Sequence, residues 1–281
     1  MAGGCSVIRL GEQKAREALH AAVHQVCAAA KISPDQISAV CIGATGAARP
    51  EIAGKIRSIL AELVSGAMPA KIEVVGDTII ALEAAFGAGP GVVAIAGTGS
   101  IVYGRDAAGH TTRAGGWGFA VSDEGSGYWI GRRAISVILS THDQGLETAL
   151  TAMVLQAWKL KTLDELVQHA NSTPPPEFPR LFPVVLRAGD EGDSVARDLL
   201  ADAGAKLAEL TATVIRRLAS GASAATPAIL LPVATTGSVF RQSQIVREIF
   251  YNTLQKNCPG IDVRQSLADP VDGALARARR K

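Results

Sequence analysis

The sequence predicts an α/β protein, and two patterns along the chain support this. The first third alternates helical stripes of apolar residues with short apolar segments of strand length, which is typical of β-α-β units around a parallel sheet. The middle carries three short strand-like segments separated by turns, and helical patterns follow. With 281 residues, 48% hydrophobic and 19% charged, the chain is expected to bury a substantial core rather than to be disordered.

The first third predicts an alternation of helices and strands. The first helix has apolar residues at helical spacing, a break at Ser33-Pro34-Asp35 follows, and a buried strand comes next. In order, the elements are a helix, a strand, a helix, a strand and a helix over residues 12–30, 37–43, 51–64, 72–75 and 78–86. Because short strands separated by helices require crossovers, we expect them to form one parallel sheet.

The middle predicts an antiparallel meander that opens a second, mixed sheet, with strands over residues 92–96, 101–103 and 111–113. The later elements are helices over 127–140, 147–157, 163–170 and 194–219, a strand over 228–231, and helices over 242–256 and 270–280. We therefore predict an N-terminal domain over residues 1–90, completed by the C-terminal helix 270–281, and a second domain over residues 91–269.

Composition argues against two classes of partner. A net charge of +2 and an aromatic content of 4% do not favour nucleic-acid binding. The basic residues at the end of the chain are expected to form a solvated helix terminus; they are Arg277, Arg279, Arg280 and Lys281. No apolar run is long enough for a membrane helix, so we expect neither nucleic acid nor a membrane as a partner.

The cysteines and histidines predict no metal site. Cys5, Cys27, Cys41 and Cys258 are widely spaced, which suits a reduced protein of the cytoplasm. His20, His24 and Cys27 have metal-ligand spacing on one expected helix, but no fourth ligand is evident nearby.

Two short segments allow both a functional and a structural interpretation. Gly97-Thr98-Gly99-Ser100 lies between two expected strands; its amides and hydroxyls could hold phosphate oxygens, but taken alone an ordinary hairpin turn is favoured. Asp77 lies between a strand and a helix. It could cap the helix, or it could accept a proton from a hydroxyl that attacks a phosphoryl group.

Residues 115–126 form the most informative stretch. Glycines surround Trp117, so the segment is expected to be a shaped loop, and Asp123 and Glu124 follow directly. Such acceptors suit sugar hydroxyls in a desolvated pocket; a charged helix start explains the stretch less well. Two later segments fit a nucleotide contact or a plain helix start. They are Gly237-Ser238 and Gly189–Asp193, which opens the long helix and where capping is favoured.

Taken in order, these segments resemble the BadF/BadG/BcrA/BcrD ATPase family on its N-acetylglucosamine kinase branch. The motifs that carry the resemblance are Gly76-Asp77, Gly97–Ser100, Gly116–Gly118, Asp123–Gly131 and Thr236–Phe240. The resemblance covers essentially the whole chain. It implies an actin-like ATPase fold of two ribonuclease-H-like lobes, and ATP-dependent phosphorylation of an amino-sugar hydroxyl, with N-acetylglucosamine as the leading substrate and Mg²⁺ as the cofactor.

Carried over residue by residue, the resemblance makes Asp77 the general base. It implies sugar contacts from Ser6, Thr45, Gly46, Gly116, Trp117, Gly118, Asp123 and Glu124. It implies nucleotide or phosphate contacts from Gly97, Thr98, Gly99, Ser100, Gly189, Gly237 and Ser238.

The sequence departs from this family at its start. Such kinases open with strands around a D-G-G-G-T loop, and the sequence contains no such loop. We therefore expect a truncated N-terminal lobe, weak or absent ATP turnover, and an exposed sheet edge that favours a homodimer. Two alternatives are kept: a non-catalytic sugar- or nucleotide-binding protein, and a dehydratase-activating ATPase. The latter needs cysteines for an iron–sulfur cluster, and none lies at a suitable glycine-rich helix start.

Overall fold

The computed structural model describes residues 7–47, 49–64, 70–220, 231–264 and 266–280, with only the backbone for residues 7–10 and 220. Contacts within the chain divide it into two compact units. The first unit contains Met1–Ala88 and Ala268–Lys281, and the second contains Gly89–Leu267. Each unit has its own sheet and its own hydrophobic cluster.

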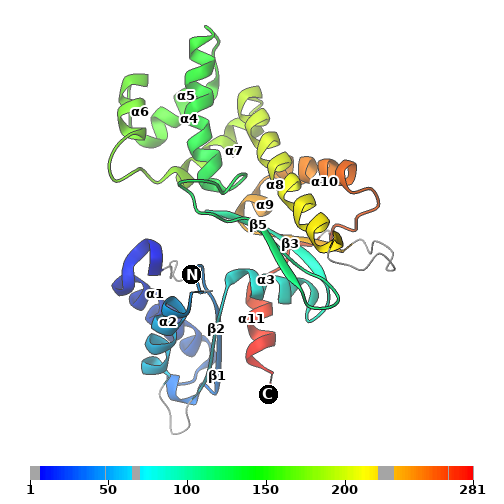
Figure 1. Ribbon diagram of the computed structural model, residues 1–281. Coiled ribbons are helices and arrows are strands. Elements are labelled where there is room, and N and C mark those ends of the chain that lie inside the picture. The colour runs from blue at the N-terminus through cyan, green and yellow to red at the C-terminus, as the bar shows by residue number, and fades with distance from the viewer. Residues whose placement is uncertain (1–6, 48, 65–69, 221–230, 265, 281) are drawn as a thin grey trace. The chain divides into compact units, whose positions relative to one another are not determined.

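In the described part of the first unit, the sheet consists of two parallel strands. β1 (Ala39–Gly43) pairs with β2 (Lys71–Val75), with Gly43 opposite Val75. Helices cover both faces (Figure 1): α1 (Val7–Ala30) and α2 (Pro50–Leu63) on one, α3 (Asp77–Phe86) and α11 (Pro270–Ala278) on the other. A 3₁₀ turn, η1 (Pro34–Gln36), precedes β1. The predicted parallel sheet is therefore confirmed, with α2 as its crossover.

Alternate residues of β1 face opposite layers of helices. Val40 and Ile42 pack against the apolar cluster of α1 and α2, which includes Leu19, Ile56 and Ile59. On the other face, Gly43 allows Ile80 of α3 to approach the strand, because a Cβ at position 43 would overlap the Ile80 side chain. Gly273 of α11 approaches Ile80 from its other side, where a Cβ would overlap the Ile80 carbonyl group.

Ion pairs join α11 to the rest of the first unit. Arg277 pairs with Glu73 of β2 and lies 3.8 Å from the Glu83 carboxylate of α3, and Arg280 also pairs with Glu83. The Glu83 side chain is only 3% exposed, so the guanidinium groups balance a charge that water cannot solvate. The prediction of a solvated basic terminus is therefore wrong for Arg277, whose side chain is only 21% exposed, whereas the Arg280 side chain is 50% exposed although it pairs with Glu83. They bind carboxylates that lie far away in the sequence.

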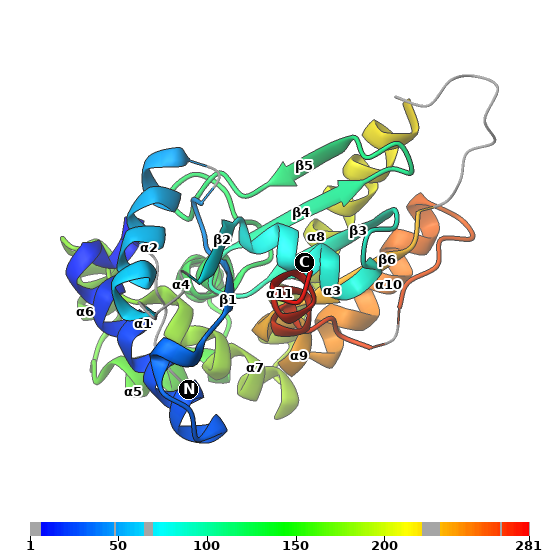
Figure 2. The ribbon, with the colours of Figure 1, turned by 90° about the horizontal axis from the view of Figure 1, so that it is seen from below.

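In the described part of the second unit, four strands form a mixed sheet in the order β5-β4-β3-β6 (Figure 2). β3 (Gly91–Ala96), β4 (Ser100–Arg105) and β5 (Thr111–Gly115) are antiparallel neighbours. The predicted meander is confirmed, and it opens a mixed sheet because the last strand is parallel to β3.

The last strand lies later in the sequence than predicted. β6 (Val233–Thr236) pairs with β3, with Val92 opposite Val233. The prediction of a strand over 228–231 is wrong at Leu231, which belongs to no strand, and residues 228–230 lie outside the described residues. Thr235 and Thr236 are buried in spite of their hydroxyl groups, because pairing with β3 and burial suit β-branched side chains.

Helices make up most of the rest of the second unit. They are α4 (Gly127–Asp143), α5 (Ala149–Trp158), α6 (Leu163–Ala170), η2 (Phe178–Leu181), α7 (Phe182–Asp190), α8 (Ser194–Ser220), α9 (Ser238–Gln242) and α10 (Gln244–Asn257). α8 packs against β3, β4 and β5, and α10 packs against α8. Among the helices that the structure describes, none combines the length and the apolar character needed to cross a membrane.

The helix α7 was not predicted from the sequence. Pro183 stands in its first turn, where the missing amide costs no helical hydrogen bond. The helix buries Phe182, Val185 and Ala188 in the main cluster of the second unit. Gly189 therefore lies inside a helix and does not open α8. The capping predicted for this segment is found at Asp193, whose Oδ1 accepts a hydrogen bond from the Ala196 amide in the first turn of α8 at 2.9 Å.

We expect Arg277→Ala to lower the free energy of unfolding at neutral pH by about 3 kcal/mol, because it removes one partner from a buried ion-pair network. The Arg277 hydrogen bonds hold the pKa of Glu73 below its usual value. This stabilisation is present above the pKa of an unfolded glutamate, about 4.3, and is lost as the pH falls through the lower folded-state value. Urea unfolding at neutral pH and near pH 3 should show the difference between variant and wild type shrink in acid.

Arg279→Ala is the matched control, because Arg279 is an exposed arginine at the same helix end. It should change the free energy of unfolding by less than about 0.5 kcal/mol. Equal losses in the two variants would show that the Arg277 ion pairs do not hold α11 in place.

Candidate functional site

The carboxyl ends of β1 and β2 bring Thr45 and Asp77 together in the first unit. The strands end level, with Gly43 opposite Val75, and the Ala44 amide donates to the Val75 carbonyl at 2.9 Å. The chain then places Thr45 beside Asp77, and the Thr45 hydroxyl donates to Asp77 Oδ2 at 2.8 Å. In open α/β sheets, the residues that contact ligands lie at this end of the parallel strands.

Asp77 is the first residue of α3, and Gly76 is its N-cap residue. The Asp77 side chain therefore does not cap the helix from the N-cap position. Its Oδ1 accepts a hydrogen bond from the Thr78 amide at 2.9 Å. Asp77 is half-buried and Thr45 is exposed, so two donors fix the carboxylate while it stays accessible. Gly46, with a φ of 83°, turns the chain away directly after Thr45.

In the second unit, the segment Gly97–Ser100 is the hairpin turn between β3 and β4, with Ala96 opposite Ser100. The Gly97 amide donates to the Gly99 carbonyl at 2.9 Å. The Gly97 carbonyl accepts from the Gly127 amide at 2.8 Å, and the Thr98 carbonyl accepts from the Tyr128 amide at 3.1 Å. The turn is thus fixed to the first turn of α4, and the exposed Thr98 side chain remains at its tip.

Asp123 lies against this turn. A Cβ at Gly99 would come within 2.7 Å of Asp123 Oδ2, so glycine at position 99 leaves the space that the carboxylate occupies. Asp123 Oδ1 accepts a hydrogen bond from the Gly118 amide at 3.3 Å. Asp123 is buried, and its φ of 67° lies in the left-handed region, where strain is more common at functional sites.

Burial raises the pKa of the Asp123 carboxyl above its usual value. The charge of the neighbouring Glu124 acts in the same direction, and the hydrogen bond from the Gly118 amide opposes both effects. Among the residues that the structure describes, the Gly118 amide is the one donor to this desolvated carboxylate. A ligand hydroxyl could therefore supply a further hydrogen bond to it.

Further hydrogen bonds tie the acidic segment to the turn. The Ser100 hydroxyl donates to the Glu124 carbonyl at 2.7 Å, and the Ser122 hydroxyl donates to Glu124 Oε2 at 2.8 Å. The Ser126 hydroxyl caps α4 by accepting from the Trp129 amide. Glu124 is thus held by its backbone and by its side chain next to Asp123.

The glycine loop around Trp117 is fixed from within while its indole faces solvent. The Trp117 side chain is 69% exposed, and the Arg113 guanidinium lies 4.2 Å from the centre of its ring. Arg113 Nη1 also donates to the Gly115 and Gly116 carbonyls, at 2.7 and 3.2 Å. Gly116 has a φ of 67°, and a side chain there would crowd Ile101.

Arg113 was missed by the sequence analysis. It stands on β5 four residues before Trp117, and nothing in that short strand marks it as more than a surface arginine. Only the turn of the chain at Gly115 and Gly116, where both glycines have positive φ, brings the guanidinium over the indole.

Gly237 and Ser238 follow β6 and lie beside the same hairpin turn. Gly237 has a φ of 106°, and a Cβ there would overlap the Ala96 carbonyl. The Ser238 hydroxyl lies 3.9 Å from where a Cβ at Gly97 would be. Gly189, by contrast, packs against Leu200 from the end of α7.

The structure thus gathers most of the predicted residues of the second unit, and those of the first unit lie together at the ends of its strands. Ser6 lies outside the described residues. Among the residues that are described, no group of three or more His, Cys, Asp or Glu side chains is placed to hold a metal ion.

The model of the BadF/BadG/BcrA/BcrD ATPase family matches residues 1–276. The chain belongs to this family. Two curated relatives in the comparison are kinases. The N-acetylmuramic acid/N-acetylglucosamine kinase of Clostridium acetobutylicum is 34% identical over 250 residues, which are 88% of this chain and 79% of the relative. The N-acetyl-D-glucosamine kinase of Dictyostelium discoideum is 28% identical over 281 residues, with 96% and 86% covered.

Solved structures agree with this family. A crystal structure from Chromobacterium violaceum, described as a candidate N-acetylglucosamine kinase, has a TM-score of 0.73 and 26% identity, covering 99% of this chain and 89% of that one. A ROK family glucokinase from Streptomyces griseus, solved with glucose and AMPPNP, has a TM-score of 0.52 and 17% identity, covering 92% and 88%. The second likeness concerns the fold alone. The fold class predicted from the sequence, an α/β protein of the actin-like ATPase kind, is confirmed.

We expect Asp123→Asn to be more stable than the wild type at neutral pH. The raised pKa means that the folded state disfavours the charged carboxylate. The contribution of Asp123 to the free energy of unfolding is therefore fully present below the unfolded pKa of about 3.9. It is lost as the pH rises through the higher folded-state value. Thermal unfolding should be measured from about pH 4 to pH 8. The melting temperature of Asp123→Asn should rise above that of the wild type as the pH increases.

Asp262→Asn is the control, because Asp262 is an exposed aspartate of the same unit. Its melting temperature should follow that of the wild type at every pH. A parallel pH dependence for wild type and Asp123→Asn would contradict the raised pKa.

Proposed function

We propose that this protein is a kinase that transfers the terminal phosphoryl group of ATP to a hydroxyl group of an amino sugar, with N-acetylglucosamine as the first candidate. Membership of the ATPase family and the names of the relatives support this activity. The observation that carries the proposal is the contact between the Asp123 carboxylate and Gly99. Because of this contact the Gly97–Ser100 turn lies beside the loop that carries Asp123, which supports adjacent phosphate and sugar contacts within one unit.

In this proposal Asp77 is the general base. The sugar hydroxyl gives its proton to the Asp77 carboxylate while its oxygen forms a bond to the γ-phosphorus, and the bond from that phosphorus to the ADP oxygen breaks. The hydrogen bond from Thr45 to Oδ2 and that from the Thr78 amide to Oδ1 hold the carboxylate in one orientation. Gly46 lets the backbone pass close to the substrate on the same side.

The second unit would bind the nucleotide and would add further sugar contacts to those of Thr45 and Gly46. We assign phosphate contacts to Gly97, Thr98, Gly99 and Ser100, and nucleotide contacts to Gly189, Gly237 and Ser238. Sugar contacts come from the loop, with Asp123 as the desolvated acceptor for hydroxyl groups, Trp117 as an apolar face, and Gly116, Gly118 and Glu124 around them. The burial of Asp123 supports directional recognition of a hydroxyl over an apolar group.

The donor set fits Mg²⁺ that arrives with ATP. Mg²⁺ is usually bound by one or two carboxylates together with substrate phosphates, not by a complete protein cage. Asp77, half-buried and accepting one hydrogen bond at each oxygen, keeps lone pairs for such an ion or for its waters. When bound, the ion would neutralise charge on the phosphates.

A second candidate function is sugar or nucleotide binding without turnover. The absence of a D-G-G-G-T loop from the sequence supports this candidate, because the family resemblance implies that active kinases use that loop for phosphate. A dehydratase-activating ATPase is less well supported. Cys27 and Cys258 are buried, and burial together with the Glu73 carboxylate raises the pKa of Cys41 to about 11, which disfavours the thiolates that a cluster needs.

We expect Asp77→Asn to lower kcat by a factor of about 10²–10⁴, because the proton acceptor is lost, while the Kd for N-acetylglucosamine changes by less than about threefold. Sugar-dependent ADP release measures kcat, and calorimetry measures Kd. Thr45→Val, which removes only the donor to Oδ2, should cost about tenfold or less.

Three outcomes separate the candidates. Wild-type turnover that Asp77→Asn abolishes supports the kinase. Sugar binding with no wild-type turnover supports the second candidate. Full turnover in Asp77→Asn shows that another residue accepts the proton.

The close approach of Asp123 to Gly99 also predicts how a substitution in the turn affects sugar binding. Gly99→Ala should weaken N-acetylglucosamine binding by about tenfold or more, since its methyl group would displace the Asp123 carboxylate. Gly97→Ala is the matched control in the same turn, because its nearest neighbour would be 3.9 Å away. Isothermal calorimetry should find a near wild-type Kd in that control. Equal Kd values in the two variants would argue against Asp123 as a sugar ligand.

A further inference from the structure

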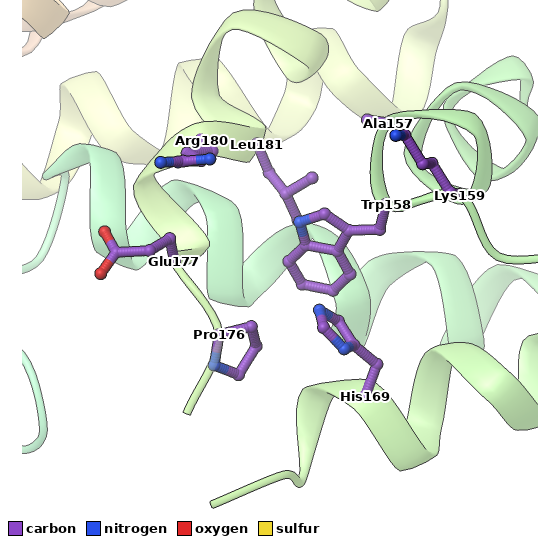
Figure 3. A pocket seen from close by; sticks show the side chains of 8 residues that line it. All are labelled: Ala157, Trp158, Lys159, His169, Pro176, Glu177, Arg180 and Leu181. Atoms are coloured by element: carbon purple, nitrogen blue, oxygen red, sulfur yellow. The ribbon is translucent and has the colours of Figure 1, made fainter. Parts of the chain in front are cut away.

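The second unit has a cavity outside the site described above. It lies between the end of α5, α6 and η2, and its volume is about 370 Å³. Figure 3 shows the Trp158 indole in the middle of the lining residues, with His169 on one side and Leu181 on the other. The remaining wall is formed by residues at and before η2, among them Pro176, Glu177 and Arg180.

Ring contacts fix the aromatic part of this cavity. The Trp158 and His169 rings are 4.7 Å apart at an interplanar angle of 70°. Trp158 also meets Phe178 edge to face, with ring centroids 5.8 Å apart. Such edge-to-face pairs are favourable arrangements, so the indole is held in one orientation and presents a defined apolar surface.

The opposite wall is anchored in the core of the unit. A Cβ at Gly131 of α4 would overlap the Phe178 carbonyl, so η2 lies directly on α4. Phe178 and Leu181 of η2 are both buried. The cavity is therefore formed before any ligand arrives, which reduces the ordering cost of binding.

The charged residues of the rim are mainly basic. Lys159 and Arg180 are exposed, and Glu177 is the acidic residue among those that line the cavity. His169 adds a second ring to the lining beside Trp158. Lys159 has a φ of 56°, a left-handed conformation at a helix end that glycine adopts more readily.

We propose that this cavity is a second binding site, for a small organic anion that contains one ring. The ring would lie against the Trp158 indole and Pro176, and the phosphate or carboxylate group would pair with Lys159 and Arg180. A volume near the lower end of the range for small-molecule sites suits one ring with one anionic group, and not a nucleotide. The proposal does not depend on the kinase activity.

Fluorine NMR of the full chain labelled with 5-fluorotryptophan tests this proposal. The chain has three tryptophans, and single Trp→Phe variants assign their resonances. The probes are benzoate and N-acetylglucosamine 6-phosphate, with inorganic phosphate at equal ionic strength as the reference. We expect at least one of the two ring-containing anions to shift the Trp158 resonance in a saturable way at millimolar concentration, and inorganic phosphate to leave it unchanged.

Three variants test the role of the basic rim. Arg180→Gln and Lys159→Gly should each weaken the binding of the active probe by about tenfold, since each removes a charge-assisted contact. Lys161→Gln, at an exposed lysine near the cavity, should keep the wild-type affinity. Lys159→Gly should in addition have an equal or higher melting temperature, because glycine relieves the left-handed conformation. Loss of affinity together with retained stability separates a binding role from a structural one.

Several results would overturn the proposal. They are no saturable shift of the Trp158 resonance with either ring-containing anion, an equal shift with inorganic phosphate, or an equal loss of affinity in Lys161→Gln and Arg180→Gln. A probe that shifts only the Trp117 resonance binds at the loop of the candidate site, and this outcome also contradicts the proposal.

Discussion

The close approach of the Asp123 carboxylate to the Gly97–Ser100 turn is the constraint on which the candidate site of the second unit depends. Gly99 must lack a side chain for the carboxylate to fit, and the hydroxyl of Ser100 then reaches the Glu124 carbonyl. Carbonyl groups of the same hairpin turn accept hydrogen bonds from the first amides of α4. The Gly97–Ser100 hairpin turn, the loop that carries Asp123 and the start of α4 are therefore in direct contact. A displacement of any one of them would displace the other two.

The first unit is organised by a different principle. Its sheet has two strands in the described part of the chain, so helices provide most of its packing. α11 contributes through Gly273, which approaches Ile80, and through arginines that neutralise the buried Glu83. This arrangement stabilises α3, the helix that begins at Asp77. The position of the proposed general base thus depends on residues at the far end of the sequence.

A row of aromatic contacts links the loop of the candidate site to the cavity beside Trp158. Phe119 of the glycine loop packs against Tyr128, Tyr128 against Phe178, and Phe178 against Trp158. Tyr128 is also the residue whose amide binds the Thr98 carbonyl. The cavity beside Trp158 and the turn beside Asp123 consequently share α4 as a common support.

Local pattern determined most of the strands and helices and which glycine turns carry special geometry. The meander of β3, β4 and β5 and the shaped loop around Trp117 follow from apolar alternation and from glycine, which act over a few residues. β6 ends in two threonines and is held by pairing with β3 and by a bridge from Val233 to Val263, while α7 buries Phe182 and Val185. Arg277 and Glu73 are 204 residues apart. Tertiary structure decided these features, because burial and charge pairing depend on neighbours that sequence distance does not reveal.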